Sequence, residues 1–243
     1  MRPMSNLNAF KSGGKGEQTR QHVFETALRL FREKGFHETT MRDVAQATDL
    51  SLGAAYYYFD TKEAIVAAYY DFVQKEHLRL SRGAFANTDD LKERIAAAVH
   101  TKLDIVAPDR KLLAALFRYG GDPDHPLNWF GPQTERQRQL SMLVFAEALQ
   151  EEKLPDDVRR AAPVMLWAMH MGLMLFLIFD KSEGQKRTRR LADGGIQLAV
   201  QARRMLKVPL LRSFRKQVNE LLTDAGLLPE IDTAVADSLK ETR

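Results

Sequence analysis

Three consecutive tyrosines, Tyr56, Tyr57 and Tyr58, carry hydroxyl groups that a buried core would not require. Successive residues of a helix point about 100° apart, so the three rings cannot all face inward. An outward phenol can hydrogen-bond to phosphate oxygens and to base edges. Just before them, Gly53 and Ala54 keep the start of the same helix slim enough to enter a major groove. The pattern indicates a helix that binds nucleic acid, although Tyr56 or Tyr58 could be partly buried against a preceding helix.

Polar residues on the neighbouring segments suit the same chemistry. Lys62 places a cation near the start of the next helix, where backbone N–H groups also favour a phosphate. Thr40 and Asp43 have the spacing of a helix start signal, and Arg42 lies in the first turn of that helix. Two alternatives stay open, because Thr40 could act only as a cap and Arg42 could be a solvated surface residue.

A helix-turn-helix arrangement would position these side chains. Phe24, Ala27, Leu28 and Phe31 recur at helical spacing and predict a helix over 17–34, which Gly35 ends. Two short helices follow near 40–48 and 52–59, and a longer one runs from 61 past 80. The short turn between the two short helices is typical of a helix-turn-helix. The residues expected to form its small core are Val44, Ala45, Leu50 and Phe59.

The rest of the chain reads as longer helices, near 89–106, 109–119, 132–151, 156–180, 186–207 and 209–224, with a weaker one at 230–240. No run alternates apolar and polar residues over the length of a strand. We therefore predict an all-α fold in which a three-helix helix-turn-helix domain precedes a larger helical domain. The expected limits are 1–16 for a flexible arm, 17–63 and 64–226 for the two domains, and 227–243 for an acidic, partly helical tail.

The sequence lacks the residues that common catalytic and metal sites use. It contains no cysteine, which excludes disulfides and thiolate chemistry. It has no Gly-rich phosphate loop and no motif of a serine hydrolase or a zinc protease. No two of its six histidines stand four residues apart. We expect no catalytic residue, metal or cofactor, and an all-α enzyme remains only an alternative.

One segment, 163–179, is apolar over 17 residues with His170 at its centre. This is just under the usual length of a membrane span, and the N-terminus has no apolar run of the kind that a signal peptide needs. We expect a buried core helix, no membrane and a cytoplasmic location.

Residues 30–70, LFREKGFHETTMRDVAQATDLSLGAAYYYFDTKEAIVAAYY, closely resemble the DNA-binding module of TetR-family regulators. Order and spacing match over about 45 residues, from the Gly-Phe that ends the first helix to the Tyr-Phe and Lys-Glu pairs. The resemblance implies that Thr40 and Arg42 begin the helix that faces DNA, and that Tyr58 and Lys62 contact phosphates. The same resemblance implies that the recognition helix carries five further candidate DNA contacts, which are Leu52, Gly53, Ala54, Tyr56 and Tyr57.

Three positions depart from the family pattern. Asp49 stands in the turn where Gly or Ala is usual, Leu52 where a polar or basic residue is common, and Ala55 where a bulky core residue is usual. The last two leave the operator sequence and the local packing open.

The resemblance also implies that the helices after about residue 75 dimerise and enclose an effector pocket. The segment 163–179 is apolar on all faces and must be covered on all sides. Ala168 and Gly172 supply a flat strip for close approach of a partner helix. We expect a homodimer through helices near 156–180 and 186–207, and the central helix of a monomeric bundle is the alternative.

Candidate pocket residues come from the aromatic and Met-rich stretches, and each is also a candidate for plain core. They are Phe117, Trp129, Phe130, Phe145, Trp167, His170, Met171 and Met174. Residues 186–216 hold ten Lys or Arg and one acidic residue, which suits a solvated face, a polyanionic effector or pairing with the acidic tail. The sequence predicts a regulator that binds double-stranded operator DNA, a repressor released by a small, mostly apolar effector. A DNA-binding protein without an effector is the alternative.

Overall fold

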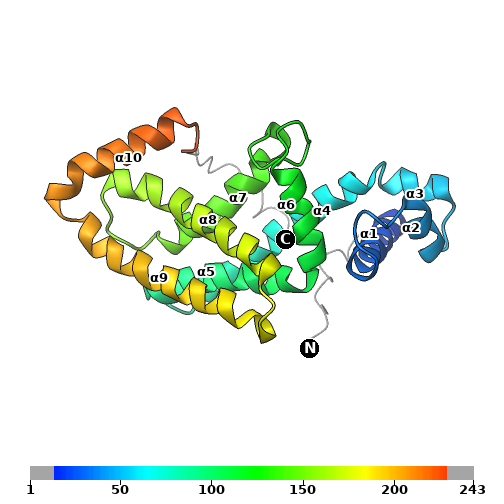
Figure 1. The fold of residues 1–243 in the computed structure, drawn as a ribbon, viewed down its shortest axis with the longest axis horizontal. Coiled ribbons are helices and arrows are strands. Elements are labelled where there is room, and N and C mark those ends of the chain that lie inside the picture. The colour runs from blue at the N-terminus through cyan, green and yellow to red at the C-terminus, as the bar shows by residue number, and fades with distance from the viewer. Residues whose placement is uncertain (1–13, 229–243) are drawn as a thin grey trace. The chain divides into compact units, whose positions relative to one another are not determined.

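The computed structural model describes residues 14–228, in which helices are joined by turns and loops and no strand is present. The all-α prediction is confirmed. The expected helix at 230–240 and most of the acidic tail lie outside the described residues, as does the arm up to residue 13. The α-helices, labelled in Figure 1, are α1 (Lys15–Glu33), α2 (Met41–Ala47), α3 (Leu52–Tyr58), α4 (Lys62–Phe85), α5 (Leu91–Val106), α6 (Arg110–Gly120), α7 (Glu135–Ala148), α8 (Asp156–Phe179), α9 (Lys186–Leu206) and α10 (Arg212–Asp224).

The chain divides into two compact units. The first contains the residues up to Tyr69 together with Lys111–Leu116, and the second contains Tyr70–Arg110 and the residues from Phe117 onward. Residue 63, where we expect the first domain to end, lies in the first turn of α4. The 24-residue α4 therefore contributes to both units.

The first unit is built on the apolar face of α1. Phe24, Ala27, Leu28 and Phe31 are buried, as their spacing predicts. The ring of Phe24 stacks on that of Phe59 with centroids 6.4 Å apart. Burial of an aromatic side chain of this kind is worth about 1.5–3 kcal/mol, so these contacts hold the two short helices against α1.

The second unit packs α8 among α7, α9 and α10, with α5 against α7 and α9. Among residues 14–228, α8 is the one helix whose length and composition would suit a membrane span. It packs against α7, α9 and α10, and 44% of its most apolar 18-residue window is buried. The loop from α8 to α9 is held by Asp180, which accepts hydrogen bonds from the Thr188 backbone N–H (2.9 Å) and hydroxyl (2.8 Å).

Candidate nucleic-acid interface

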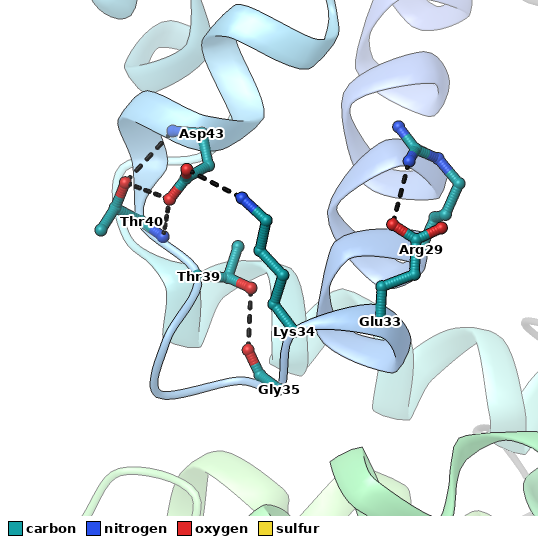
Figure 2. A network of polar contacts seen from close by, with 7 residues as sticks. All are labelled: Arg29, Glu33, Lys34, Gly35, Thr39, Thr40 and Asp43. Atoms are coloured by element: carbon teal, nitrogen blue, oxygen red, sulfur yellow. Dashed lines mark hydrogen bonds and ion pairs between the residues drawn. The ribbon is translucent and has the colours of Figure 1, made fainter.

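The first helix of the motif, α2, has a reciprocal cap at its N-terminus (Figure 2). The Thr40 hydroxyl accepts the Asp43 backbone N–H at 3.1 Å, and the Thr40 N–H donates to an Asp43 carboxylate oxygen at 2.8 Å. This is the capping box that the spacing predicts. The same hydroxyl donates to Asp43 at 2.6 Å, so the capping role of Thr40 is confirmed. A DNA contact by this hydroxyl stays a prediction.

The cap is tied to the end of α1. The Lys34 ammonium donates to the other Asp43 oxygen at 3.2 Å. The hydrogen bonds from Thr40, followed by the Lys34 contact, lower the pKa of Asp43 to about 2. Between the two helices, Gly35 has a φ of +100°, a left-handed conformation that favours glycine, and its carbonyl accepts the Thr39 hydroxyl at 2.8 Å (Figure 2). The start of α2 is therefore fixed in position by its own loop.

The turn from α2 to α3 passes through Asp49, whose φ of 53° is left-handed. Asp adopts this conformation more readily than most residues other than Gly, so the departure from the family pattern at this position is accommodated. The Ser51 hydroxyl caps α3 by accepting the Ala54 N–H at 3.1 Å. Ala45 and Ala55 are both buried, and their small side chains let α2 and α3 lie close together. Leu50, expected in the same small core, is only half-buried.

One face of α3 is exposed within its own unit. The Tyr57 side chain is 83% exposed and Tyr56 and Leu52 are also exposed. Tyr58 is half-buried, with its ring edge-to-face against Tyr57 at 5.2 Å, and burial of a tyrosine against the preceding helix stays a prediction. A side chain at Gly53 would meet no atom within 4 Å, so packing within the unit does not require a glycine there.

The two cations expected at the interface differ in their surroundings. Arg42 is exposed on α2. The Lys62 ammonium donates to the carbonyl oxygens of Phe36 (2.9 Å) and His37 (3.4 Å) and lies 4.6 Å from the centre of the Phe36 ring. Lys62 therefore stabilises the loop after α1, and its phosphate contact remains a prediction.

Two family profiles match the chain. The one described as bacterial regulatory proteins, tetR family, matches residues 23–69, which include every residue of the interface above. The one described as tetracyclin repressor-like, C-terminal domain, matches residues 94–221, more than half of the chain. The chain belongs to the TetR family of transcriptional regulators. It is a DNA-binding regulator with a helix-turn-helix domain and a larger helical domain, and not an enzyme.

Individual TetR-family proteins show the same relationship. The HTH-type transcriptional regulator TtgR of Pseudomonas putida is 31% identical over 165 residues, which cover 61% of this chain and 75% of TtgR. A TetR transcriptional regulator from Nitrosomonas europaea has a TM-score of 0.61 at 20% identity, covering 74% of this chain and 97% of that one. Thermus thermophilus FadR, a TetR-family repressor solved in complex with lauroyl-CoA, has a TM-score of 0.54 at 21% identity, covering 74% and 93%.

The recognition face gives a direct prediction. Tyr57→Ala and Arg42→Ala should each weaken operator binding by about 1–3 kcal/mol if the side chains reach bases. Neither should lower the melting temperature, because both side chains are exposed. Tyr57→Phe keeps the ring and isolates the hydroxyl contribution. Fluorescence anisotropy with labelled operator measures the affinities, and unchanged binding in Tyr57→Ala, Arg42→Ala and Gly53→Arg together would remove this face from the interface.

In the helical unit, the six aromatic residues among the eight pocket candidates come together in three pairs. The rings of Phe117 and Trp129 lie 4.6 Å apart and those of Phe130 and Trp167 lie 6.2 Å apart. Phe145 and His170 meet edge-to-face at 5.5 Å and are buried. Trp167 and Met174 are buried, Met171 is half-buried, and Phe130 is 61% exposed.

A cavity of about 510 Å³ lies elsewhere in the same unit, and none of the eight residues lines it. Its walls come mainly from α5, α8, α9 and α10, with residues of the α7–α8 connection. Small side chains on α8 and α9 leave the space, among them Ala161, Ala162, Ala199 and Ala202. Met165 and Met169 supply flexible apolar wall. The sequence alone carries only a weak signal for this cavity, two alanines on each of the two helices.

Half of the ten Lys and Arg residues in the basic stretch 186–216 form ion pairs inside the same unit. Arg189 contacts Asp104 at 2.6 Å, and Arg215 contacts Asp157 at 2.8 Å. Arg203 forms an ion pair with Glu152. These contacts favour a solvated, locally neutralised face. Of the acidic residues toward the C-terminus, Glu220 pairs with Lys216 one turn away.

Proposed function

We propose that this TetR-family regulator is a cytoplasmic repressor that binds a palindromic operator as a homodimer and is released by a small, mostly apolar molecule. The cavity of about 510 Å³ carries this proposal. Its size is within the range of small-molecule pockets, roughly 300–1,000 Å³. FadR of Thermus thermophilus, a repressor of this family, is described in complex with lauroyl-CoA, a ligand with a long apolar chain.

The charges at the cavity are balanced. Arg203 pairs with Glu152 and Arg215 pairs with Asp157, so both guanidinium groups already have carboxylate partners. The remaining wall is dominated by Leu, Ala, Met and Val side chains. A site of this kind selects by shape and apolar area, which supports a mostly apolar effector.

The dimer rests on an apolar face that residues 14–228 leave uncovered. On α8, Leu175 and Phe179 are exposed, Phe179 to 69%, and Met165, which also lines the cavity, is exposed at its rim. On α9, Leu191 and Met205 are exposed, and Leu198, between them on the same side, is 67% exposed and also lines the cavity, so the proposed dimer face adjoins the cavity rim. Ala168 and Gly172 continue the α8 face. A contiguous apolar surface marks an interaction site, and a second copy of this chain would bury it by two-fold symmetry.

Release of the repressor from DNA by an effector follows from the spacing of the two operator half-sites. The recognition helices of a dimer must stand about one turn of DNA or somewhat more apart. An effector that favours a different spacing of the recognition helices lowers the affinity for the operator. It can do so only by as much as its own affinity differs between the DNA-binding form and the released form of the dimer. A tenfold release needs about 1.4 kcal/mol, which burial of a few apolar groups can supply.

The experiment is a screen of neutral lipophilic compounds read in two ways. Trp129 and Trp167 are the only tryptophans, and Trp167 follows Leu166 of the cavity wall, so binding should change intrinsic fluorescence. The second readout is release of labelled operator. Ala162→Phe, which fills the cavity, should raise the compound concentration needed for the fluorescence change and for operator release at least tenfold. Ala86→Phe, at an exposed site, should leave both unchanged. Saturable fluorescence changes without operator release would indicate a pocket without a switch.

A further inference from the structure

Three basic side chains are buried together in the core of the helical unit. Lys102 on α5 is 2% exposed, and His77 on α4 and His170 on α8 are fully buried. The rings of His77 and His170 lie 5.9 Å apart. His77 donates through Nε2 to the Ala98 carbonyl at 2.7 Å, and Ala98 lies one turn before Lys102 on α5. The three groups therefore form one cluster, which we call the basic core.

The basic core contains no acidic partner. The Lys102 ammonium donates to the Gln74 side-chain oxygen at 2.7 Å, and no ion pair joins it to a carboxylate within residues 14–228. Burial lowers the pKa of Lys102 to about 7. Burial, followed by the charge of Lys102, lowers the pKa of His170 to about 3, so His170 is neutral near pH 7. Lys102 is the one member that carries substantial charge near neutral pH, and that charge is uncompensated.

Several polar atoms of the same core have no partner among the described residues. They are both ring nitrogens of His170, the Nδ1 atom of His77 and the hydroxyl of Ser81, one turn beyond His77. Buried polar groups are nearly always hydrogen-bonded in native proteins. A neutral His170 offers one N–H donor, Ser81 offers one O–H donor, and Lys102 has two N–H donors beyond the one given to Gln74. The His170 N–H, the Ser81 hydroxyl and the Lys102 ammonium are donors from which an anionic oxygen group can accept hydrogen bonds, whereas His77 Nδ1 and the second His170 nitrogen are acceptors.

The basic core lies close along the helices to the cavity. Ile95 on α5 and Leu166 on α8 line the cavity. Lys102 follows Ile95 by two turns on the same face, about 10 Å along the axis. His170 follows Leu166 by one turn, about 6 Å. No side chain of the basic core lines the cavity, so a ligand with its apolar body there would have to extend its polar end about 10 Å along α5 to reach Lys102.

We propose that the natural effector is an organic acid, whose apolar body occupies the cavity and whose carboxylate binds Lys102, with the His170 N–H and the Ser81 hydroxyl as further donors. A carboxylate bound to an ammonium and to N–H donors makes charge-assisted hydrogen bonds, which are stronger than neutral ones. The proposal rests on the proposed function for the cavity itself and adds the charge of the ligand.

The test compares acids with their neutral amides of the same shape. The probes are decanoate with decanamide and 2-naphthoate with 2-naphthamide, titrated at pH 7 against the dimer and the dimer–operator complex. In the wild type, at least one acid should bind tenfold or more tightly than its amide, by tryptophan fluorescence, and should release operator. Lys102→Met should abolish this preference while leaving amide binding within about twofold. Lys92→Met, an exposed lysine on the same helix, should leave the preference intact.

The outcomes separate this proposal from the proposed function. If amides and acids bind the wild type equally and both release operator, the cavity is the effector site and the basic core does not recognise an anion. If Lys102→Met keeps the full acid preference, another group holds the carboxylate and the proposal is overturned. If no acid or amide binds while neutral lipophilic compounds of other shapes release operator, the acid proposal also fails. If no compound of any class releases operator, the proposed function fails instead. Circular dichroism of each variant verifies that it is folded.

Discussion

Leu175→Glu should convert the dimer into a monomer and lower operator affinity by about 10²- to 10⁴-fold, the loss expected when two linked half-site contacts become one. Leu175 lies on the exposed apolar face of α8, between Gly172 and Phe179. A carboxylate there would be buried without a partner in the dimer, which is strongly unfavourable. The same side chain would be solvated in the monomer, so the fold should survive. Sedimentation velocity measures the assembly state and gel shifts measure the affinity.

Two further variants refine the dimer experiment. Leu80→Glu changes an exposed leucine of α4 and should leave the dimer unchanged. Gly172→Glu should act like Leu175→Glu, because space around Gly172 is open within its own chain. Met169→Glu is a poorer test than its position in an apolar helix suggests, since Met169 lines the cavity and packs against Gly195. Sedimentation of the wild type as a monomer at micromolar concentration would show that something other than a second copy covers the face.

Lys102→Met should raise the free energy of unfolding by several kcal/mol at pH 7, and the gain should shrink as the pH rises toward 10. The pKa of Lys102 is about 7 in the folded protein against an ordinary value of 10.5. Between these values the unfolded chain binds more protons, so wild-type stability rises with pH, by at most about 1.4 kcal/mol per pH unit. Below pH 7 both states are protonated and the full cost of the buried ammonium remains. Methionine has no charge to bury, so its curve lacks this slope.

Urea unfolding between pH 6.5 and 9.5 measures this effect in the wild type and in both lysine variants. Lys92→Met serves as the control because Lys92 is exposed at the start of the same helix, and its curve should run parallel to that of the wild type. Parallel curves for Lys102→Met and the wild type would mean that the buried ammonium is compensated in solution. In that case the core would already hold a counter-charge.

The helix-turn-helix was predictable because its signals are local. The Thr40–Asp43 spacing predicts a capping box, Ser51 predicts the start of α3, and Gly35 predicts the end of α1. Each signal acts over three or four residues, so the structure reproduces it directly. The apolar character of α8 likewise predicted a helix too apolar for one chain to cover.

The cavity and the basic core were not predictable in the same way. Aromatic and methionine residues are pocket candidates by type alone, whereas small side chains such as Ala161 on α8 and Ala199 on α9 line the cavity. That arrangement depends on which helices become neighbours. Lys102 reads as a surface residue by type, because lysine is almost never fully buried, although its spacing from Ile95 and Ala98 places it on the buried face of α5.

Gly53 bears on how such regulators diverge. Its backbone is ordinary helix and the space around its missing side chain is open, and the neighbouring Leu52 and Tyr57 are likewise exposed. Mutations at these positions therefore carry little penalty for folding, since surface changes away from packed features usually alter stability by no more than about 0.5 kcal/mol. The DNA sequence that the protein prefers can therefore change, in evolution or by engineering, through single substitutions on α3 that leave the stability of the fold almost unchanged.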